Sequence, residues 1–156
     1  VDGKLDRSKA YTYAENGIAN ILNQNPSIDV VIDLHRDGVA ETTRLVTNID
    51  GKQMAKVMLF NGLSYSVRNG DIGYLYNPYR DDNLAMSLQM YLLGQAYYPD
   101  YFRRIYVNAY RYCLHERGKS MLIEAGAQTN TFEEVKNAME PLADLLDKLL
   151  KGEKAY

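Results

Sequence analysis

Two ionisable side chains stand where the chain otherwise has the pattern of a buried strand. His35 directly follows the apolar segment IDVVIDL at residues 28–34, and Glu124 lies near the end of SMLIEA at residues 120–125. Burial of an unpaired carboxylate is costly, and desolvation raises its pKa toward the range that suits a general acid or base near neutral pH. Imidazole is the commonest zinc ligand in proteins. Glu124 is therefore a candidate catalytic base and His35 a candidate metal ligand.

Both residues also have a purely structural interpretation. Glu124 could form an ion pair with a nearby arginine, and His35 could be a loop residue that is hydrogen-bonded to a neighbouring carboxylate. The possible partners are Arg36 and Arg111 for Glu124, and Asp33 and Asp37 for His35.

The other polar residues give weaker signals. His115 is one of two histidines, and its spacing from Cys113, the single cysteine, matches no zinc-binding signature. Four aspartates could bind a hard cation, although helix capping or solvation explains them more simply: Asp33, Asp37, Asp81 and Asp82. The Asn- and Gly-rich segment 61–80, which we expect to be irregular, could line a groove for a sugar or a peptide.

The periodicity of the chain predicts apolar strands alternating with helices. Apolar residues three and four apart predict helices over residues 8–24 and from residue 81 or 82, a possible cap, to about 98. Thr131 and Glu134 form a capping-box pattern before a last helix, in which Pro141 predicts a kink or a local break. We expect residues 28–34 and 120–125 to be strands buried on both faces, with a loop at residues 35–38.

Two further strand-like segments are expected to pair as a β-hairpin. Residues 42–49 and 53–60 flank the turn dipeptide Asp50-Gly51, and Asn61-Gly62 should end the second strand. A further short strand is expected at residues 104–107. These elements predict an α/β fold with a mostly parallel or mixed central sheet, flanking helices and an inserted hairpin. In open parallel sheets, sites form beyond the carboxyl ends of strands, which is where His35 and Glu124 stand.

Length and composition limit the classes of protein that fit. The 156 residues suit one domain, and 46 % hydrophobic with 24 % charged residues are ordinary values for a globular protein. A net charge of −2 lacks the basic field that nucleic-acid binding needs. No apolar run approaches the roughly 20 residues of a membrane span.

Several motifs together resemble the stage II sporulation protein P family. They are DLHRDG at residues 33–38, NPY at 77–79, NLA at 83–85 with SLQM at 87–90, YRY at 110–112 and EAGAQTNT at 124–131. The resemblance runs from about residue 8 to about residue 150. The last motif, E-x-G-x-x-T-N, is also similar to the signature of zinc-dependent N-acetylmuramoyl-L-alanine amidases, whose catalytic glutamate opens it.

This resemblance implies an amidase-like fold and a peptidoglycan hydrolase of endospore-forming bacteria. The expected reaction cuts the amide between N-acetylmuramic acid and the L-alanine of the stem peptide, and endopeptidase activity is also credited to the family. The expected location is outside the cytoplasm, at the septum between mother cell and forespore during engulfment. Stage II sporulation proteins D and M are the implied partners, and an N-terminal segment absent from this sequence would anchor the protein to the membrane.

The resemblance also implies roles for individual residues. His35 matches a zinc ligand and Glu124 the catalytic glutamate. Asp33 or Asp37 would orient the imidazole of His35. Three further residues are candidates for contacts with the site or the substrate, namely Arg36 through a neighbouring or stem-peptide carboxylate, His115 and Asn130.

One feature of the family is missing from this sequence. The family carries an earlier His-Thr-His segment with a nearby glutamate, and a catalytic zinc needs about three protein ligands. We therefore expect residues 1–156 to be the C-terminal, larger part of one amidase catalytic domain, with weak zinc binding, poor activity and an open sheet edge. The alternatives are a non-catalytic module that binds peptidoglycan or a partner, and a related zinc peptidase.

Overall fold

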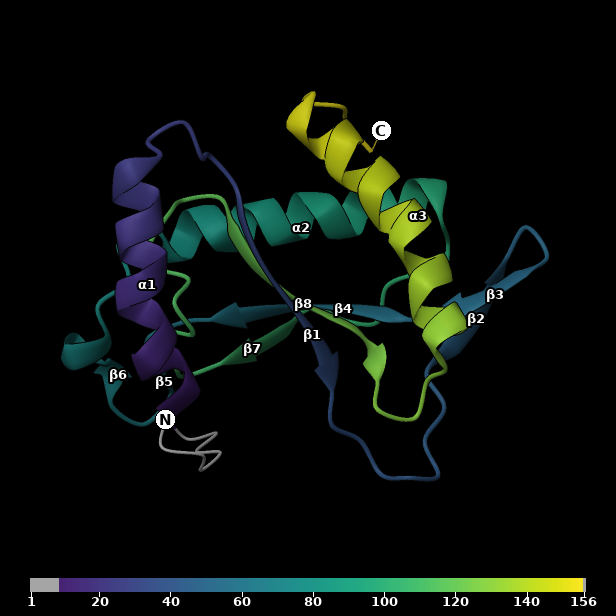
Figure 1. The fold of residues 1–156 in the computed structure, drawn as a ribbon, viewed down its shortest axis with the longest axis horizontal. Helices are drawn as coiled ribbons and strands as arrows, with labels where there is room; N and C mark the ends of the chain where they lie inside the picture. The colour runs from purple at the N-terminus through teal and green to yellow at the C-terminus, as the bar shows by residue number, and fades with distance from the viewer. Residues whose placement is uncertain (1–8, 156) are drawn as a thin grey trace.

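The sheet at the centre of the molecule joins strands from both halves of the chain (Figure 1). The computed structural model describes residues 9–155. Its four-stranded sheet has the order β1 (Val31–Asp37), β8 (Ser120–Ala127), β4 (Val57–Gly62) and β7 (Tyr106–Asn108). β8 is parallel to β1 and antiparallel to β4, and β4 is parallel to β7. The predicted α/β class with a mixed central sheet is confirmed.

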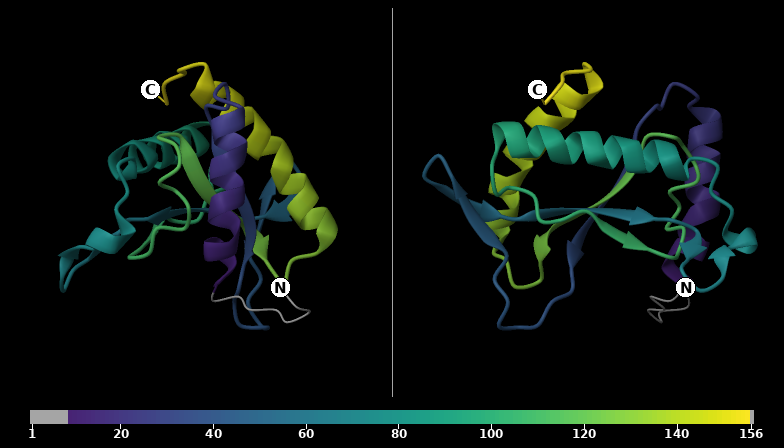
Figure 2. Two further views of the ribbon diagram at one scale, coloured as in Figure 1. Left: turned by 60° about the vertical axis from the view of Figure 1, so that its left-hand side comes forward. Right: turned by 180° about the vertical axis from the view of Figure 1, so that it is seen from behind.

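The remaining elements flank this sheet. The helices are α1 (Ala10–Gln24), α2 (Arg80–Tyr97) and α3 (Phe132–Leu150). Two small hairpins, β2 (Val46–Ile49) with β3 (Lys52–Ala55) and β5 (Tyr65–Ser66) with β6 (Gly70–Asp71), lie outside it, and a 3-10 turn, η2, spans Gly73–Leu75. α1, β5, β6 and β7 lie at one end of the molecule, as Figure 2 also shows, and the β2–β3 hairpin lies at the other.

The apolar core lies between the sheet and helices α2 and α3. Met121 and Ile123 of β8 are fully buried in one cluster with Leu93 of α2 and Leu145 of α3. Side chains alternate along a strand, so Leu122 and Glu124 belong to the opposite face of β8. That opposite face carries the candidate site.

Local sequence signals correctly predicted several element ends. The side chain of Thr131 accepts a hydrogen bond from the backbone amide of Glu134, and the carboxylate of Glu134 accepts one from the backbone amide of Thr131, which confirms the capping box. Asp50 and Gly51 both have positive φ in the β2–β3 turn, as a tight hairpin requires. The break predicted at Pro141 is absent, because α3 continues through that residue. α2 begins after Tyr79, and Asp81 and Asp82 lie in its first turn rather than at the cap.

The prediction for the first strand was wrong in two respects. β1 runs from Val31 to Asp37, so the segment expected to be a loop after Leu34 is mostly strand. The expected burial on both faces is also absent, because β1 lies at a sheet edge and Ile32 and Leu34 expose 40 % and 53 % of their surface. An apolar run is compatible with a central or an edge position, and the second neighbour that would bury these residues is missing among residues 9–155.

The return strand of the hairpin was also predicted too long. β3 ends at Ala55, and β4 begins at Val57 as a separate strand that pairs with β8 in the central sheet. β4 ends at Gly62, so the strand end predicted at Asn61-Gly62 is confirmed, although both residues still belong to the strand. Buried Asn61 accepts a hydrogen bond from Ser87. The segment expected to be irregular contains β5, β6 and η2, and the strand expected at 104–107 is β7.

No helix within residues 9–155 combines the length and the hydropathy that crossing a membrane requires.

The edge position of β1 predicts unequal costs for two truncations at paired positions. Leu34 pairs with Ile123, which is fully buried. Ile123→Ala should lower the free energy of unfolding by about 2–5 kcal/mol, and Leu34→Ala by less than about 1 kcal/mol. Urea denaturation of both variants measures this difference, and equal costs would contradict the edge assignment.

Candidate functional site

The parallel pairing of β1 with β8 places His35 directly opposite Glu124. Paired residues on neighbouring strands project from the same face, and residues two apart on one strand share that face. Asp33 and His35 of β1 therefore lie on the face that carries Glu124 of β8. The register shifts between His35 and Asp37, so the strand is irregular directly after the histidine.

The imidazole of His35 is held by a short chain of contacts. Its Nε2 lies 2.6 Å from Oδ1 of Asp33, and the hydroxyl of Tyr11 donates to the other oxygen of Asp33 over 2.9 Å. The rings of Tyr11 and His35 are parallel within 5°, with centroids 6.3 Å apart. Burial, and then the hydrogen bond to Asp33, raise the pKa of Tyr11, so this residue stays a donor. Of the two aspartates expected to orient His35, Asp33 makes the contact, whereas Asp37 forms an ion pair with Arg103.

The carboxyl group of Glu124 is half-buried and incompletely satisfied. Its Oε2 is shielded from solvent and has no hydrogen-bond partner among the described residues. Burial is the main cause that raises the pKa of Glu124, and Asp37 and Asp33 raise it further, while His35 and Arg103 act in the opposite direction. Orphaned polar groups in a folded protein call for an explanation, and a catalytic role is one.

Neither arginine that could have neutralised Glu124 does so. Arg111 forms an ion pair with Glu15 of α1 over 2.5 Å. Arg36 donates to the backbone carbonyls of Ala127 and Asn130. The structural interpretation of Glu124 as an ion-pair partner of Arg36 or Arg111 is therefore not what the structure shows.

Arg36 and Asn130 shape the loop that follows β8. Asn130 is buried, accepts a hydrogen bond from the amide of Ala127 and donates to Leu45 and Glu134. Its side chain is thus occupied within the protein, and the guanidinium of Arg36 bonds backbone carbonyls instead of the neighbouring carboxylate considered from the sequence. The contacts of both residues hold the loop after β8 in place.

His115 belongs to a separate cluster. Its Nε2 lies 3.0 Å from Glu15 and 3.2 Å from Glu116, and among residues 9–155 these are the three donors that come close enough together to hold a metal ion. The guanidinium of Arg111 already lies against the same oxygen of Glu15. Burial lowers the pKa of His115, with Arg111 contributing in the same direction. A cation would have to compete with this arginine.

Three residues of these clusters were not predicted from the sequence, namely Tyr11, Glu15 and Arg103. Tyr11 and Glu15 lie on α1, where their spacing is that of an ordinary helix surface. Arg103 precedes β7. No local pattern marks any of them, because their partners are remote in the sequence.

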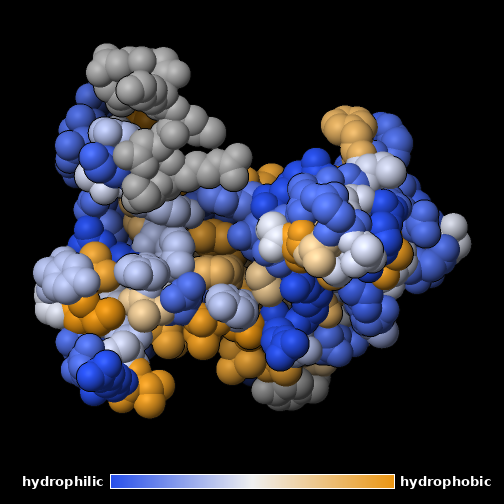
Figure 3. All heavy atoms as spheres, turned by 90° about the horizontal axis from the view of Figure 1, so that it is seen from below, coloured by the Kyte–Doolittle hydropathy of each residue, from blue (hydrophilic) through white to orange (hydrophobic). Residues whose placement is uncertain are grey.

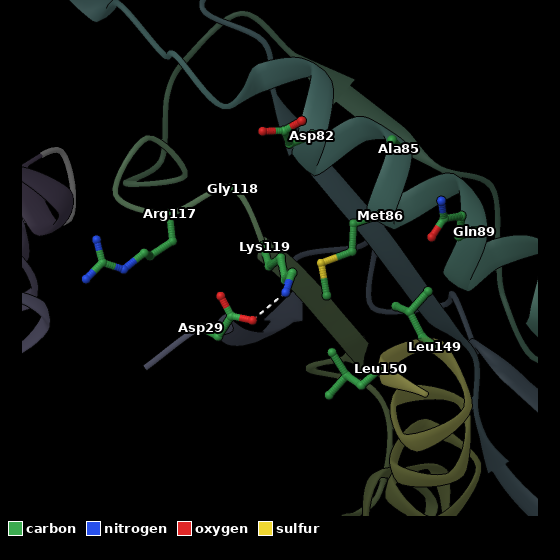
Figure 4. A pocket seen from close by; sticks show the side chains of 10 residues that line it. All are labelled: Asp29, Asp82, Ala85, Met86, Gln89, Arg117, Gly118, Lys119, Leu149 and Leu150. Atoms are coloured by element: carbon green, nitrogen blue, oxygen red, sulfur yellow. Dashed lines mark hydrogen bonds and ion pairs between the residues drawn. The ribbon is translucent and has the colours of Figure 1, made fainter. Parts of the chain in front are cut away.

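Two cavities adjoin the candidate site and a third does not. A cavity of about 310 Å³ lies beside His35 between α1 and β1, and one of about 390 Å³ shares Tyr11 and Tyr112 with it. A view from the side to which the carboxyl ends of β1 and β8 point shows hydrophobic surface in the hollow between the two ends of the molecule (Figure 3). A larger hollow of about 430 Å³ holds the Asp29–Lys119 ion pair (Figure 4). Asp29 and Lys119 precede β1 and β8, so this hollow lies at the opposite strand ends.

The donors at His35 suit zinc in kind but are too few in number. A catalytic zinc site needs about three protein ligands and an open position. The described residues offer one imidazole here, oriented by Asp33, beside the orphaned oxygen of Glu124. No group of three potential donors that includes His35 occurs within residues 9–155.

The raised pKa of Glu124 predicts how stability depends on pH. A carboxyl with a higher pKa in the folded state than in the unfolded state binds more protons when folded, so its ionisation destabilises the fold as pH rises above about 4.5. Glu124→Gln should therefore be more stable than the wild type at pH 7, and the gain should shrink as pH falls toward 4. Urea denaturation across this range measures it, with Glu41→Gln as an exposed control. A Glu124→Gln protein less stable than the wild type at pH 7 would refute this explanation.

Comparison with known proteins identifies the family of this chain. The model of the family Stage II sporulation protein P (SpoIIP) matches residues 2–147. No curated protein and no solved structure matches the chain. The match covers nearly the whole chain, including both strands of the candidate site and the loops after them. The chain therefore belongs to the stage II sporulation protein P family and so to the proteins of sporulation.

Proposed function

We propose that this chain carries the catalytic base and one zinc ligand of an N-acetylmuramoyl-L-alanine amidase that degrades peptidoglycan during sporulation. The observation that carries the proposal is the pairing of His35 with Glu124 on adjacent parallel strands, with one carboxylate oxygen left unsatisfied. Family membership supplies the sporulation context. The motif that opens with Glu124 supports relationship to the amidase fold.

Glu124 has the properties of a general base in this reaction. Its pKa is raised by burial, so the carboxylate accepts a proton more readily than an exposed glutamate does. In the proposed role it takes a proton from the attacking water and passes it to the departing amine of L-alanine. A bound zinc ion would lower the pKa of that water and polarise the carbonyl of the amide that is cut.

Asp33 and Tyr11 have positioning roles in this proposal. Asp33 fixes the orientation of the His35 ring, and Tyr11 fixes Asp33 from α1. Carboxylates that bond a ligating imidazole commonly set its tautomer and raise its basicity. The His35 ring is thus oriented to act as one zinc ligand. The remaining zinc ligands would come from outside residues 9–155.

The biological setting follows from the family and is part of the proposal. The substrate would be septal peptidoglycan between mother cell and forespore, outside the cytoplasm, and endopeptidase activity on the stem peptide would be a second activity. Stage II sporulation proteins D and M are the proposed partners, and a membrane anchor would lie outside residues 9–155.

A second candidate function is non-catalytic binding of peptidoglycan or a partner. The single imidazole at the site favours it, because one ligand holds zinc weakly. A zinc peptidase related to the amidases would use the same His35 and Glu124 geometry, and it differs in the bond that it cuts.

Release of stem peptides from purified sacculi tests the proposal. In the native protein that contains this chain, with zinc present, Glu124→Gln should lower the rate about 100-fold to 10,000-fold, because general acid–base catalysis contributes this much. Glu116→Gln is the matched control and should keep the rate. Mass spectrometry of the products separates amidase from peptidase cleavage. Peptide release that survives Glu124→Gln would remove this residue from the catalytic role.

Zinc affinity distinguishes the two histidines. His35→Ala should lower zinc affinity of the native protein at least about tenfold, since loss of a ligand or its supporting contact has such effects. His115→Ala should leave the affinity unchanged. Calorimetric titration measures both, and the reverse order would assign the metal to the Glu15–His115–Glu116 cluster.

A further inference from the structure

Exposed tyrosines gather at the end of the molecule that carries α1. Those on the hairpin, the 3-10 turn, β7 and the loop after it each expose between 42 % and 82 % of their surface, namely Tyr65, Tyr74, Tyr76, Tyr106 and Tyr110. These elements lie at the same end of the molecule in Figures 1 and 2. Large apolar rings exposed together mark binding surfaces more often than inert ones.

Part of this surface is concave and leads to the candidate site. The cavity of about 390 Å³ is lined by Tyr11, Leu75, Tyr110 and Tyr112, and by the ion pair of Arg111 with Glu15. Tyr11 lines this cavity, and its ring stacks on that of His35. The ring of Tyr11 therefore stands between the cavity and the candidate zinc ligand.

One ring that lines the cavity is held by several aromatic contacts. Tyr112 makes edge-to-face contacts with Tyr11, Phe60 and Tyr110, at centroid distances of 5.3, 4.9 and 6.2 Å. A side-chain carbon on Gly62 of β4 would come within 2.3 Å of the carbonyl of Tyr110, so the loop packs directly on the strand. Such fixed rings form a preorganised platform, which lowers the cost of binding.

The backbone beneath this platform is strained. Tyr112 and Cys113 both have positive φ, at 54° and 58°, a conformation that side chains other than glycine adopt at a cost. Strain of this kind persists where the surrounding structure enforces it, and it concentrates at binding sites. The two strained residues are Tyr112 itself, which contacts three aromatic rings, and Cys113, which also lines the cavity.

We propose that this cavity binds the glycan chain of peptidoglycan, with the tyrosine rings stacking on the sugar faces. A pyranose presents apolar C–H faces and a rim of hydroxyls, and tyrosine presents an apolar ring and a hydroxyl that stays wet. The charged pair in the cavity is internally neutralised, which suits an uncharged sugar better than an ion. The inference rests on the proposed function, because the cavity would hold the sugar whose linked peptide reaches His35 and Glu124.

Binding of a peptide-free glycan tests this inference without catalysis or zinc. The probe is a soluble tetrasaccharide of alternating N-acetylglucosamine and N-acetylmuramic acid, titrated into the protein by calorimetry. Its lactyl carboxyl groups are converted to simple amides, because the stem peptide keeps them uncharged in the same way in peptidoglycan. Tyr110→Ala should weaken binding about threefold to tenfold, the loss expected for one aromatic contact. Tyr110→Phe should retain most of the affinity because it keeps the ring.

The matched control is Tyr97→Ala on α2, whose ring is comparably exposed but lies near the C-terminus of α3, where it contacts Lys148. This variant should bind as the wild type does. Failure of the wild type to bind the tetrasaccharide, or equal affinity of all variants, would overturn the inference. Loss of binding to a protein partner with unchanged glycan affinity in Tyr110→Ala would also overturn it and assign the tyrosines to a protein interface.

This test is independent of the amidase assay. Glycan binding that depends on Tyr110 in a protein without hydrolase activity would support the inference while contradicting the proposed reaction. Hydrolysis of sacculi without glycan binding would do the opposite.

Discussion

The parallel register of β1 on β8 is the constraint on which the candidate site depends. It brings together His35 and Glu124, which are remote in the sequence, and sets them opposite each other on one face of the sheet. A slip of one residue would turn the side chains of one strand to the other face. Glu124 would then enter the core that Met121 and Ile123 share with α2 and α3. Because that core fixes β8, the register is strongly determined, and the position of Glu124 follows from it.

The two faces of β8 therefore contribute to stability in opposite ways. One face gains stability from complete apolar burial, and the other keeps a half-buried carboxyl group with an unsatisfied oxygen. Nearby carboxylates of Asp33 and Asp37 add to the cost of ionising Glu124, while Arg103 is engaged with Asp37. Natural proteins usually keep such locally unfavourable groups at functional sites, where the rest of the fold compensates for them. The aromatic contacts from Tyr11 to Tyr112 extend the same face from His35 toward the exposed tyrosines.

Signals in the sequence predicted that His35 and Glu124 lie on neighbouring strands, but they predicted less of the structure around these two residues. Apolar runs that end in polar residues indicated that His35 and Glu124 lie near the ends of neighbouring strands, and in the structure both lie inside β1 and β8. The turn at Asp50-Gly51 and the cap at Thr131 were predicted because they depend on local chemistry. An open sheet edge was expected, but its location at β1 was not predictable, since the run before His35 suits a strand with one neighbour or two. β4 was not predicted as a separate strand, because only Lys56 separates it from β3 and the strand-like pattern of residues 53–60 looks continuous. The contacts of Tyr11 with Asp33 and of Glu15 with His115 depend on tertiary packing of α1 and leave no periodic signal.

The central claim is that His35 and Glu124 serve one metal-bound water. A crystal structure of the native protein with zinc, with the metal located by its anomalous scattering, tests this most directly. The account predicts zinc about 2 Å from an imidazole nitrogen of His35, with the Glu124 carboxylate about 4–8 Å from that imidazole and facing the water on the metal. Zinc bound by His115, Glu15 and Glu116, with His35 free of metal, would contradict it.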